Sequence, residues 1–246
     1  MQLITNSLIT AARKATKFLQ RDFLELEMLQ RSSKGNDDFC AKAYSKMKES
    51  LRSDLQKYAN LLVFSDDQYV LNAESKSVIL IHPIDSLSNF ARSIPFFALS
   101  ITYLSMVENT LTTISSIINF PVLNEIYYVE KGRGMWVDSN NANRGRLRVS
   151  GISHLDKSLV AIDSWDIDSI SERNIRVFGS HCYTMQMFAA GKVDAVYFSS
   201  LNDILRAGFD LIVRESGGVV ISNDEQKFVA TNYELAEKFR SVIARK

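Results

Sequence analysis

The stretch Ile81-His82-Pro83-Ile84-Asp85-Ser86-Leu87-Ser88-Asn89-Phe90 decides the fold of this chain. It begins where a short, continuous apolar run that starts at Val78 ends, and such a run is typical of a buried strand. A second run, at 96–107, alternates apolar and small residues and predicts a central strand. The stretch therefore connects two predicted strands, and its polar side chains are expected where the first strand ends.

The chain on either side of this stretch alternates between helical and strand patterns. Apolar residues at helical spacing predict an amphipathic helix over 7–29, a polar loop over 31–38, and a second amphipathic helix that presents Met47, Leu51, Leu55 and Tyr58 on one side. Strands are predicted at 61–64 and 78–81. The segment 114–137 reads as strand, turn, strand, with Gly132 and Gly134 as the hairpin signal.

The chain is expected to leave this first sheet near residue 150 and to enter a second sheet at 159–162. Helices are predicted at 185–190, at 205–215 and at 234–245, with strands at 195–198 and 219–222. Because helices and strands alternate in groups, we predict an α/β (α+β) fold of mixed sheets between helix layers. Residues 1–150 and 151–246 are expected to form two halves that pack as one structural unit.

Composition excludes several classes of protein. The chain has 246 residues and a formal net charge of +1, so no large basic field attracts nucleic acid, and any such contact is expected to be weak or indirect. Cys40 and Cys182 show no CxxC spacing and suit a reducing compartment. No apolar run approaches the ~20 residues of a membrane span, and charges interrupt the first helix, unlike a signal peptide. We expect a cytoplasmic protein.

Three segments, in the right order, resemble the inositol monophosphatase family. The stretch 81–90 resembles the signature D-P-[IL]-D-G-T-x-N-F, and the segment 179–220, with Ala-Ala-Gly-Lys-Val-Asp and Glu-Ser-Gly-Gly, resembles the family's C-terminal block. Lys34-Gly35 and Asp38 resemble an early K-G-x-x-D loop. The combination is most similar to the bacterial extragenic suppressor (SuhB) branch. It implies a layered αβαβα sandwich with two mixed sheets.

The resemblance also implies a chemistry with strict requirements. Family members hydrolyse phosphate monoesters with Mg²⁺, a reaction that needs up to ~10²¹-fold acceleration. Two closely spaced ions activate water and stabilise the leaving oxygen. Since Mg²⁺ demands hard oxygen ligands in near-octahedral order, carboxylates must stand at fixed places.

Transferred onto this sequence, the family's metal ligands are largely replaced. A glutamate falls on Asp66 of the pair Asp66-Asp67, one bridging aspartate falls on His82, and another falls on Leu205. Imidazole is a poor ligand for Mg²⁺, and leucine is no ligand. The family's carbonyl donor at Ile84 and the carboxylate of Asp85 remain. The weakened metal set is therefore Asp66, Ile84 and Asp85.

The replacements extend to the neighbouring positions. Ser86 and Leu87 replace a glycine and a threonine at the expected phosphate-binding helix start, whereas Lys34 and Asp38 match the family. Other family positions carry Tyr44 for an aspartate, Phe198 for a substrate-contacting glutamate, and Ile204 for a tryptophan. Whether Asp203 replaces the aspartate missing at Leu205 stays open at this stage.

These losses predict a pseudoenzyme without a cofactor, in which no catalytic set is intact. By resemblance to the suppressor branch, it is expected to be a homodimeric scaffold in contact with transcription antitermination factors or RNA polymerase. The rival interpretation is an active Mg²⁺-dependent phosphatase acting on inositol monophosphate or a related sugar or nucleotide phosphate. A third is a sensor that binds a phosphorylated metabolite through Lys34, Ser86 and Leu87. His82 with Asp85 as a site for a different metal, and His181-Cys182 as a nucleophile, are further alternatives.

Overall fold

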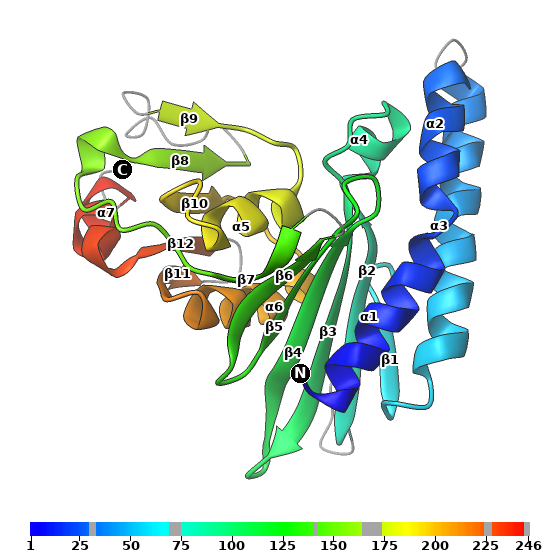
Figure 1. Ribbon diagram of the computed structural model, residues 1–246, viewed down its shortest axis with the longest axis horizontal. Coiled ribbons are helices and arrows are strands. Elements are labelled where there is room, and N and C mark those ends of the chain that lie inside the picture. The colour runs from blue at the N-terminus through cyan, green and yellow to red at the C-terminus, as the bar shows by residue number, and fades with distance from the viewer. Residues whose placement is uncertain (30–32, 69–74, 140–141, 164–173, 224–227, 244–246) are drawn as a thin grey trace.

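The computed structural model describes residues 1–29, 33–68, 75–139, 142–163, 174–223 and 228–243. Inside those ranges, the side chains of 27–29, 33–37, 142–144, 222–223 and 242–243 stay outside the description. The described residues form two β-sheets that are flanked and separated by helices (Figure 1). The predicted α/β fold with two mixed sheets is confirmed.

The first sheet contains the strands in the order in which they follow in the chain. They are β1 (Leu61–Phe64), β2 (Ser77–Asp85), β3 (Ala98–Val107), β4 (Thr110–Phe120), β5 (Glu125–Glu130), β6 (Gly134–Ser139) and β7 (Ala142–Leu147). β1 pairs with β2 in parallel, and each later strand pairs with its predecessor in antiparallel orientation. The parallel pair matters for the site, because both of its strands end at the same edge of the sheet.

The second sheet has the order β11-β12-β10-β8-β9. Its strands are β8 (Leu159–Ile162), β9 (Asn174–Arg176), β10 (Ala195–Phe198), β11 (Gly218–Asn223) and β12 (Phe228–Asn232). β8 pairs in parallel with both β9 and β10, whereas β12 pairs antiparallel with β10 and β11. This sheet is therefore mixed as well.

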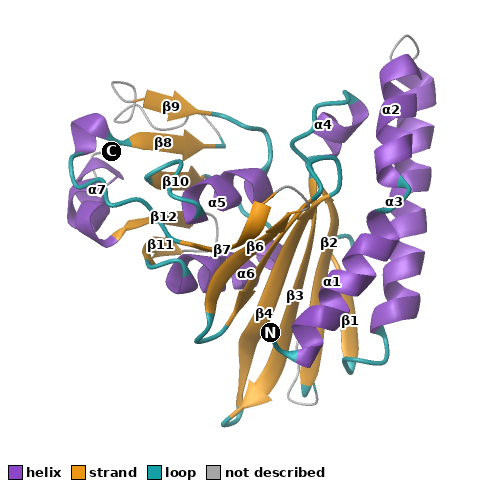
Figure 2. Ribbon diagram, viewed as in Figure 1, coloured by secondary structure: helices purple, strands orange, loops and turns teal. Residues whose placement is uncertain are grey.

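Helices complete the layers (Figure 2). They are α1 (Leu3–Thr16), α2 (Leu19–Leu29), α3 (Ser33–Leu55), α4 (Leu87–Ala91), α5 (His181–Ala189), α6 (Asp203–Glu215) and α7 (Ala236–Ile243), with 3₁₀ turns at Leu155–Lys157 and Tyr233–Leu235. α1 and α3 cover one face of the first sheet, α6 contacts both sheets, and α7 packs on the second sheet. The succession of layers is αβαβα.

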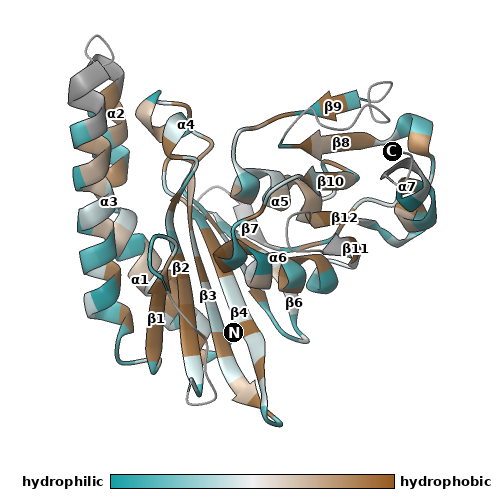
Figure 3. Ribbon diagram, turned by 180° about the vertical axis from the view of Figure 1, so that it is seen from behind, coloured by the Kyte–Doolittle hydropathy of each residue, from teal (hydrophilic) through white to brown (hydrophobic). Residues whose placement is uncertain are grey.

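Two large apolar clusters hold the layers together. One joins α1, α2 and α3 to the first sheet, and it includes Leu8, Met47, Leu51 and Ile79, all with side chains shielded from water. β1 and β2 are coloured mostly hydrophobic in Figure 3, as expected of strands that pack against helices. The other cluster lies between the two sheets around α5 and α6. Each sheet thus buries an apolar face against helices, as its sequence pattern requires.

The predicted single helix over 7–29 is wrong in one respect, because the chain forms α1 and α2 with a break at residues 17–18. Apolar spacing continues through the break without glycine or proline, so the sequence offers no local stop signal there. The predicted polar loop over 31–38 is also wrong, since α3 begins at Ser33. A polar first turn reads as a loop unless the helix that follows it is known.

Other boundaries also differ from prediction, and the strand predicted at 78–81 extends over Ser77–Asp85. The segment 114–137 holds parts of three strands, because a turn at residues 121–124 separates β4 from β5. The Gly132–Gly134 turn is confirmed, and both glycines have positive φ, 75° and 80°. The predicted helices at 185–190 and 205–215 begin earlier, at His181 and Asp203. The closing helix begins at Ala236, after a 3₁₀ turn.

Candidate functional site

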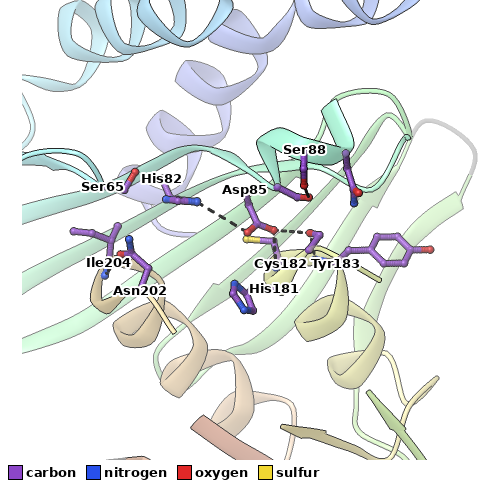
Figure 4. Close-up of polar contacts among 12 residues, drawn as sticks. Ser65, His82, Asp85, Ser88, His181, Cys182, Tyr183, Asn202 and Ile204 are labelled. Atoms are coloured by element: carbon purple, nitrogen blue, oxygen red, sulfur yellow. Dashed lines mark hydrogen bonds and ion pairs between the residues drawn. The ribbon is translucent and has the colours of Figure 1, made fainter. Parts of the chain in front are cut away.

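The candidate site lies at the edge where β1 and β2 end. The backbone N–H of Ser65 donates to the carbonyl of Ile81 at 3.0 Å, so the residues just after β1, including Asp66, lie beside the last part of β2, which contains His82. The N-terminus of α5 approaches Asp85 from the layer between the sheets (Figure 4). Segments far apart in sequence thus meet at this edge.

Asp85 is buried, and one of its carboxylate oxygens accepts two hydrogen bonds. Its side chain is 4% exposed, and Oδ2 accepts the hydroxyl of Ser180 at 2.5 Å and the backbone N–H of Cys182 at 2.9 Å. Ser180 is the N-cap of α5, and its Oγ also accepts the N–H of Tyr183 at 3.0 Å. A carboxylate at a helix N-terminus is favoured by the unsatisfied N–H groups and the helix dipole. Asp85 therefore anchors α5 to the end of β2.

The thiol of Cys182 lies beside this carboxylate. Burial raises the pKa of Cys182 well above its usual range, and the charge of Asp85 raises it further. A thiol in such surroundings stays protonated at neutral pH, whereas a nucleophile must be a thiolate. The geometry therefore gives no support to Cys182 as a nucleophile.

The side chain of His82 lies near Asp85 but forms no hydrogen bond with it. Its Nε2 is 4.0 Å from Oδ1 of Asp85, which is too long for a hydrogen bond, and its buried Nδ1 has no partner among the described residues. Burial lowers the pKa of His82. The charge of Asp85 raises it and the nearby imidazole of His181 lowers it, and the net result is a pKa below the usual value. The ring is neutral at pH 7.

Asp66 and Asp67 surround an ammonium group. Lys48 Nζ lies 2.8 Å and 3.0 Å from the two carboxylate oxygens of Asp66, and 2.8 Å from Oδ1 of Asp67. The hydroxyl of Tyr44 donates to Asp66 Oδ1 at 3.0 Å. Burial alone would raise the pKa of Asp66 and of Asp67, but hydrogen bonds from Lys48 lower both. Both carboxylates are charged and already paired.

The start of α6 directs its carboxylate away from the site. Asp203 has a side chain that is 78% exposed and lies 3.5 Å from Arg206. Leu205, predicted to stand at the family's aspartate position, is 1% exposed and belongs to the apolar cluster between the sheets. Ile204 packs in a separate cluster with Val63 and Val78. Neither Asp203 nor Leu205 brings an oxygen to the edge.

Two of the expected phosphate-binding residues, Ser86 and Leu87, lie at the start of α4. Ile84 is buried, and Ser86 lies in the left-handed region at φ 63° and ψ 65°, where the family has glycine. Leu87 starts α4 and is 43% exposed. The side chain of Lys34 is outside the described residues, so its predicted role in phosphate binding stays a prediction. Asp38 is exposed on α3.

Sequence reasoning missed a pocket next to this edge. A cavity of about 320 Å³ is lined by Asp163, Ser180, His181, Thr184 and Ser200. Asp163 accepts the N–H of Ser199 at 2.8 Å and lies 3.3 Å from His181 Nε2. Burial raises the pKa of Asp163, but hydrogen bonds from His181 and from backbone amides lower it overall.

Two signals in the sequence point to the missed residues. Asp163 directly follows the apolar run 159–162, so it stands at a strand end. Lys48 follows Tyr44 at the i, i+4 spacing that puts two side chains on one helix face. Phe198, predicted to stand at the family's glutamate position, is buried against the ring of His181 with centroids 4.7 Å apart.

The donors at the edge do not fit a pair of Mg²⁺ ions. In the described part of the chain, no group of three or more His, Cys, Asp or Glu side chains is placed to hold one metal ion. Asp66 is paired with Lys48, His82 offers nitrogen, and Leu205 is apolar, whereas Mg²⁺ needs several oxygens in octahedral order.

No described helix has the length and hydropathy required to cross a bilayer.

Comparisons with known proteins agree with the fold. The model of the "Inositol monophosphatase family" matches residues 1–242. An "Inositol-1-monophosphatase" of Caulobacter vibrioides is 30% identical over 89% of each chain. "Nus factor SuhB" of Escherichia coli (strain K12) is 25% identical over 89% of this chain and 85% of that protein.

Solved structures are similar over the whole length. The crystal structure of "extragenic suppressor protein suhB" from Bartonella henselae matches with a TM-score of 0.81 and 24% identity, covering 100% of both chains. Inositol monophosphatase from Anabaena (Nostoc) sp. PCC 7120 matches with a TM-score of 0.76 over 98% of this chain and 95% of that one. Both show the same arrangement of layers. This chain belongs to the inositol monophosphatase family.

Proposed function

We propose that this chain is a family member that does not hydrolyse phosphate monoesters and that serves as a binding scaffold. The observation that carries the proposal is the engagement of the remaining carboxylates by the protein itself. Asp85 is bound by Ser180 and the α5 amide, and Asp66 is bound by Lys48. No described carboxylate replaces the one missing at Leu205.

The size of the expected loss supports the proposal. Changes next to metal ligands cost ~10–100-fold in affinity or activity. On that scale, the loss of two bridging aspartates and a supporting one costs at least ~10³–10⁶-fold. Hydrolysis would then fall below detection.

A phosphate-release assay tests the proposal directly. The purified chain is incubated with inositol 1-phosphate and Mg²⁺, with the Asp85→Asn variant as the matched control. We expect no phosphate release above the Asp85→Asn background at any Mg²⁺ concentration. Turnover that requires Mg²⁺ and disappears in Asp85→Asn would overturn the proposal.

The names of relatives support a partner for the scaffold. Relatives from Escherichia coli, Haemophilus influenzae and Vibrio cholerae carry the name "Nus factor SuhB". We propose by analogy that this chain associates with antitermination factors or RNA polymerase. In this proposal it is a cytoplasmic homodimer, and its contact with nucleic acid is weak or indirect. Affinity purification from native cells, with mass spectrometry, is expected to recover transcription components. Light scattering tests the dimer.

The rival function is a Mg²⁺-dependent phosphatase acting on inositol monophosphate or a related phosphate. It is favoured by the Caulobacter and Mesorhizobium relatives, which carry the name "Inositol-1-monophosphatase" at 30% and 27% identity. In this rival, Asp66, Asp85 and a rearranged Asp203 hold the ions. The same phosphate-release assay, run with Asp203→Asn, separates the two functions.

A further inference from the structure

The ammonium of Lys48 occupies the centre of the corner formed by Tyr44, Asp66 and Asp67. Its Nζ contacts oxygens of both aspartates at 2.8 Å. Asp67 is fixed from the other side, because its Oδ2 accepts the backbone N–H of Phe64 at 3.0 Å. The same ammonium lies 4.9 Å from the ring centroid of Phe64, a favourable cation–π distance. The cation is therefore held by three groups, which are the two carboxylates and the Phe64 ring.

The backbone that carries this cation is rigid on both sides. Lys48 lies within the 23-residue helix α3, and the helix packs on the first sheet through Met47 and Leu51, both 0% exposed. Asp66 and Asp67 follow β1 directly, and the N–H of Asp67 closes a turn onto the carbonyl of Phe64 at 2.9 Å. The Lys48 side chain is 22% exposed, less than the 51% of Asp66. The ammonium is thus the inner member of the cluster.

A free divalent ion competes poorly with a cation of this kind. The lysine is covalently tethered, so its binding carries no loss of translational freedom, whereas an ion from solution must lose it. An ion at Asp66 would also stand next to a fixed positive charge. Repulsion between like charges is strong where water is partly excluded.

We propose that Lys48 is a tethered cation that takes the place of a divalent ion at the Tyr44–Asp66–Asp67 corner and keeps such ions out. The protein is then stable without metal and indifferent to chelators. Removal of the ammonium leaves two adjacent carboxylates with no counter-charge, and the corner becomes a site for a hard divalent cation.

The test uses Mn²⁺ as the probe and Lys48→Met as the key variant. Methionine keeps most of the stem and removes only the charge. Mn²⁺ binding is measured from the electron paramagnetic resonance signal of the free ion, and thermal unfolding is recorded with and without Mn²⁺. We expect Lys48→Met to bind Mn²⁺ at least ~10-fold more tightly than the parent, because the repelling charge is gone, and residues beside a metal site change its affinity on a scale of ~10–100-fold. Its Tm should rise with Mn²⁺.

Three further variants locate the effect. Lys42→Met removes an exposed lysine from the same helix and should behave like the parent. Lys48→Arg keeps a cation and should still exclude Mn²⁺. Lys48→Met with Asp66→Asn should lose the gained binding. If Lys48→Met fails to fold, Lys48→Gln replaces it.

Equal Mn²⁺ affinity in the parent and Lys48→Met would overturn the inference. So would Mn²⁺ binding by the parent that Asp66→Asn abolishes. The inference extends the proposed absence of hydrolysis, but its readouts are ion binding and Tm, not phosphate release. Phosphate release by the parent would therefore count against the proposed function alone, and equal Mn²⁺ affinity against the tethered cation alone.

Discussion

The carboxylate of Asp85 accepts the backbone N–H of Cys182 at 2.9 Å, which ties the end of β2 to the first turn of α5. The two residues are 97 positions apart in the chain, and both are buried. The hydroxyl of Ser180 binds the same oxygen. The most prominent acid of the candidate site thus also holds two layers of the fold together.

Asp85→Ala is expected to lower the free energy of unfolding by about 1–3 kcal/mol, because it leaves a buried N–H and a buried hydroxyl without their acceptor. Asp85→Asn keeps one acceptor oxygen and should cost less. Urea denaturation measures both. Asp156→Asn, at an exposed carboxylate, should stay within about 0.5 kcal/mol of the parent. Parent-like stability of Asp85→Ala would contradict the anchoring role.

Ser86→Gly is expected to stabilise the protein. Ser86 has φ 63° and ψ 65°, a left-handed conformation that costs a non-glycine residue roughly 1–2 kcal/mol. Part of the gain is lost because glycine is freer in the unfolded chain, so we expect about 0.5–1 kcal/mol. Thermal unfolding measures the gain. Ser88→Gly, within α4, should lower the Tm of the protein instead. A shift of the Tm in the same direction in both variants would contradict the strain assigned to Ser86.

His82 should make stability depend on pH near neutrality. Burial lowers the pKa of His82 below its usual value of about 6.5, so between the two values the unfolded chain binds more protons than the folded one. The free energy of unfolding therefore falls as pH drops through about 6.5 toward the lower pKa of the folded state. His82→Gln should flatten this slope in urea titrations, whereas His154→Asn, at an exposed histidine, should leave it unchanged. An unaltered slope in His82→Gln would refute the assignment.

Leu205→Asp, which introduces the aspartate predicted from the family at that position, should be strongly destabilising by itself. Leu205 is 1% exposed in an apolar cluster, so an unpaired carboxylate there should cost at least about 3 kcal/mol. Leu205→Met, with similar volume, should cost less than about 1.5 kcal/mol. Chemical denaturation with and without Mg²⁺ provides the measurement. A stable Leu205→Asp variant that Mg²⁺ stabilises further would show that this position faces an ion site.

Local patterns were sufficient where an element is apolar and continuous. The runs at 61–64, 159–162 and 195–198 became β1, β8 and β10 with the predicted bounds. The starts of α3, α5 and α6 were missed, and in α3 the reason is a polar first turn that resembles a loop. The break between α1 and α2 was missed as well, since the apolar spacing runs through it unchanged.

In the candidate site, too, some features could be predicted from the sequence and others could not. Alignment with the family's motifs identified Asp66, His82, Asp85 and Leu205 as the positions that matter. It did not indicate that Lys48 would reach Asp66 and Asp67 from α3, or that Ser180 and Cys182 would bind Asp85. These partners lie far away in sequence and meet the acids only through packing.

The sequence alone determined the family and the two mixed sheets, and it indicated the positions at which the family's ligands are predicted to be replaced, because these depend on residue type and order. The tertiary structure decided what the surviving acids contact and which side chains face solvent. Hydrogen bonds and ion pairs act over a few ångströms between residues brought together by the core, so no one-dimensional pattern contains them.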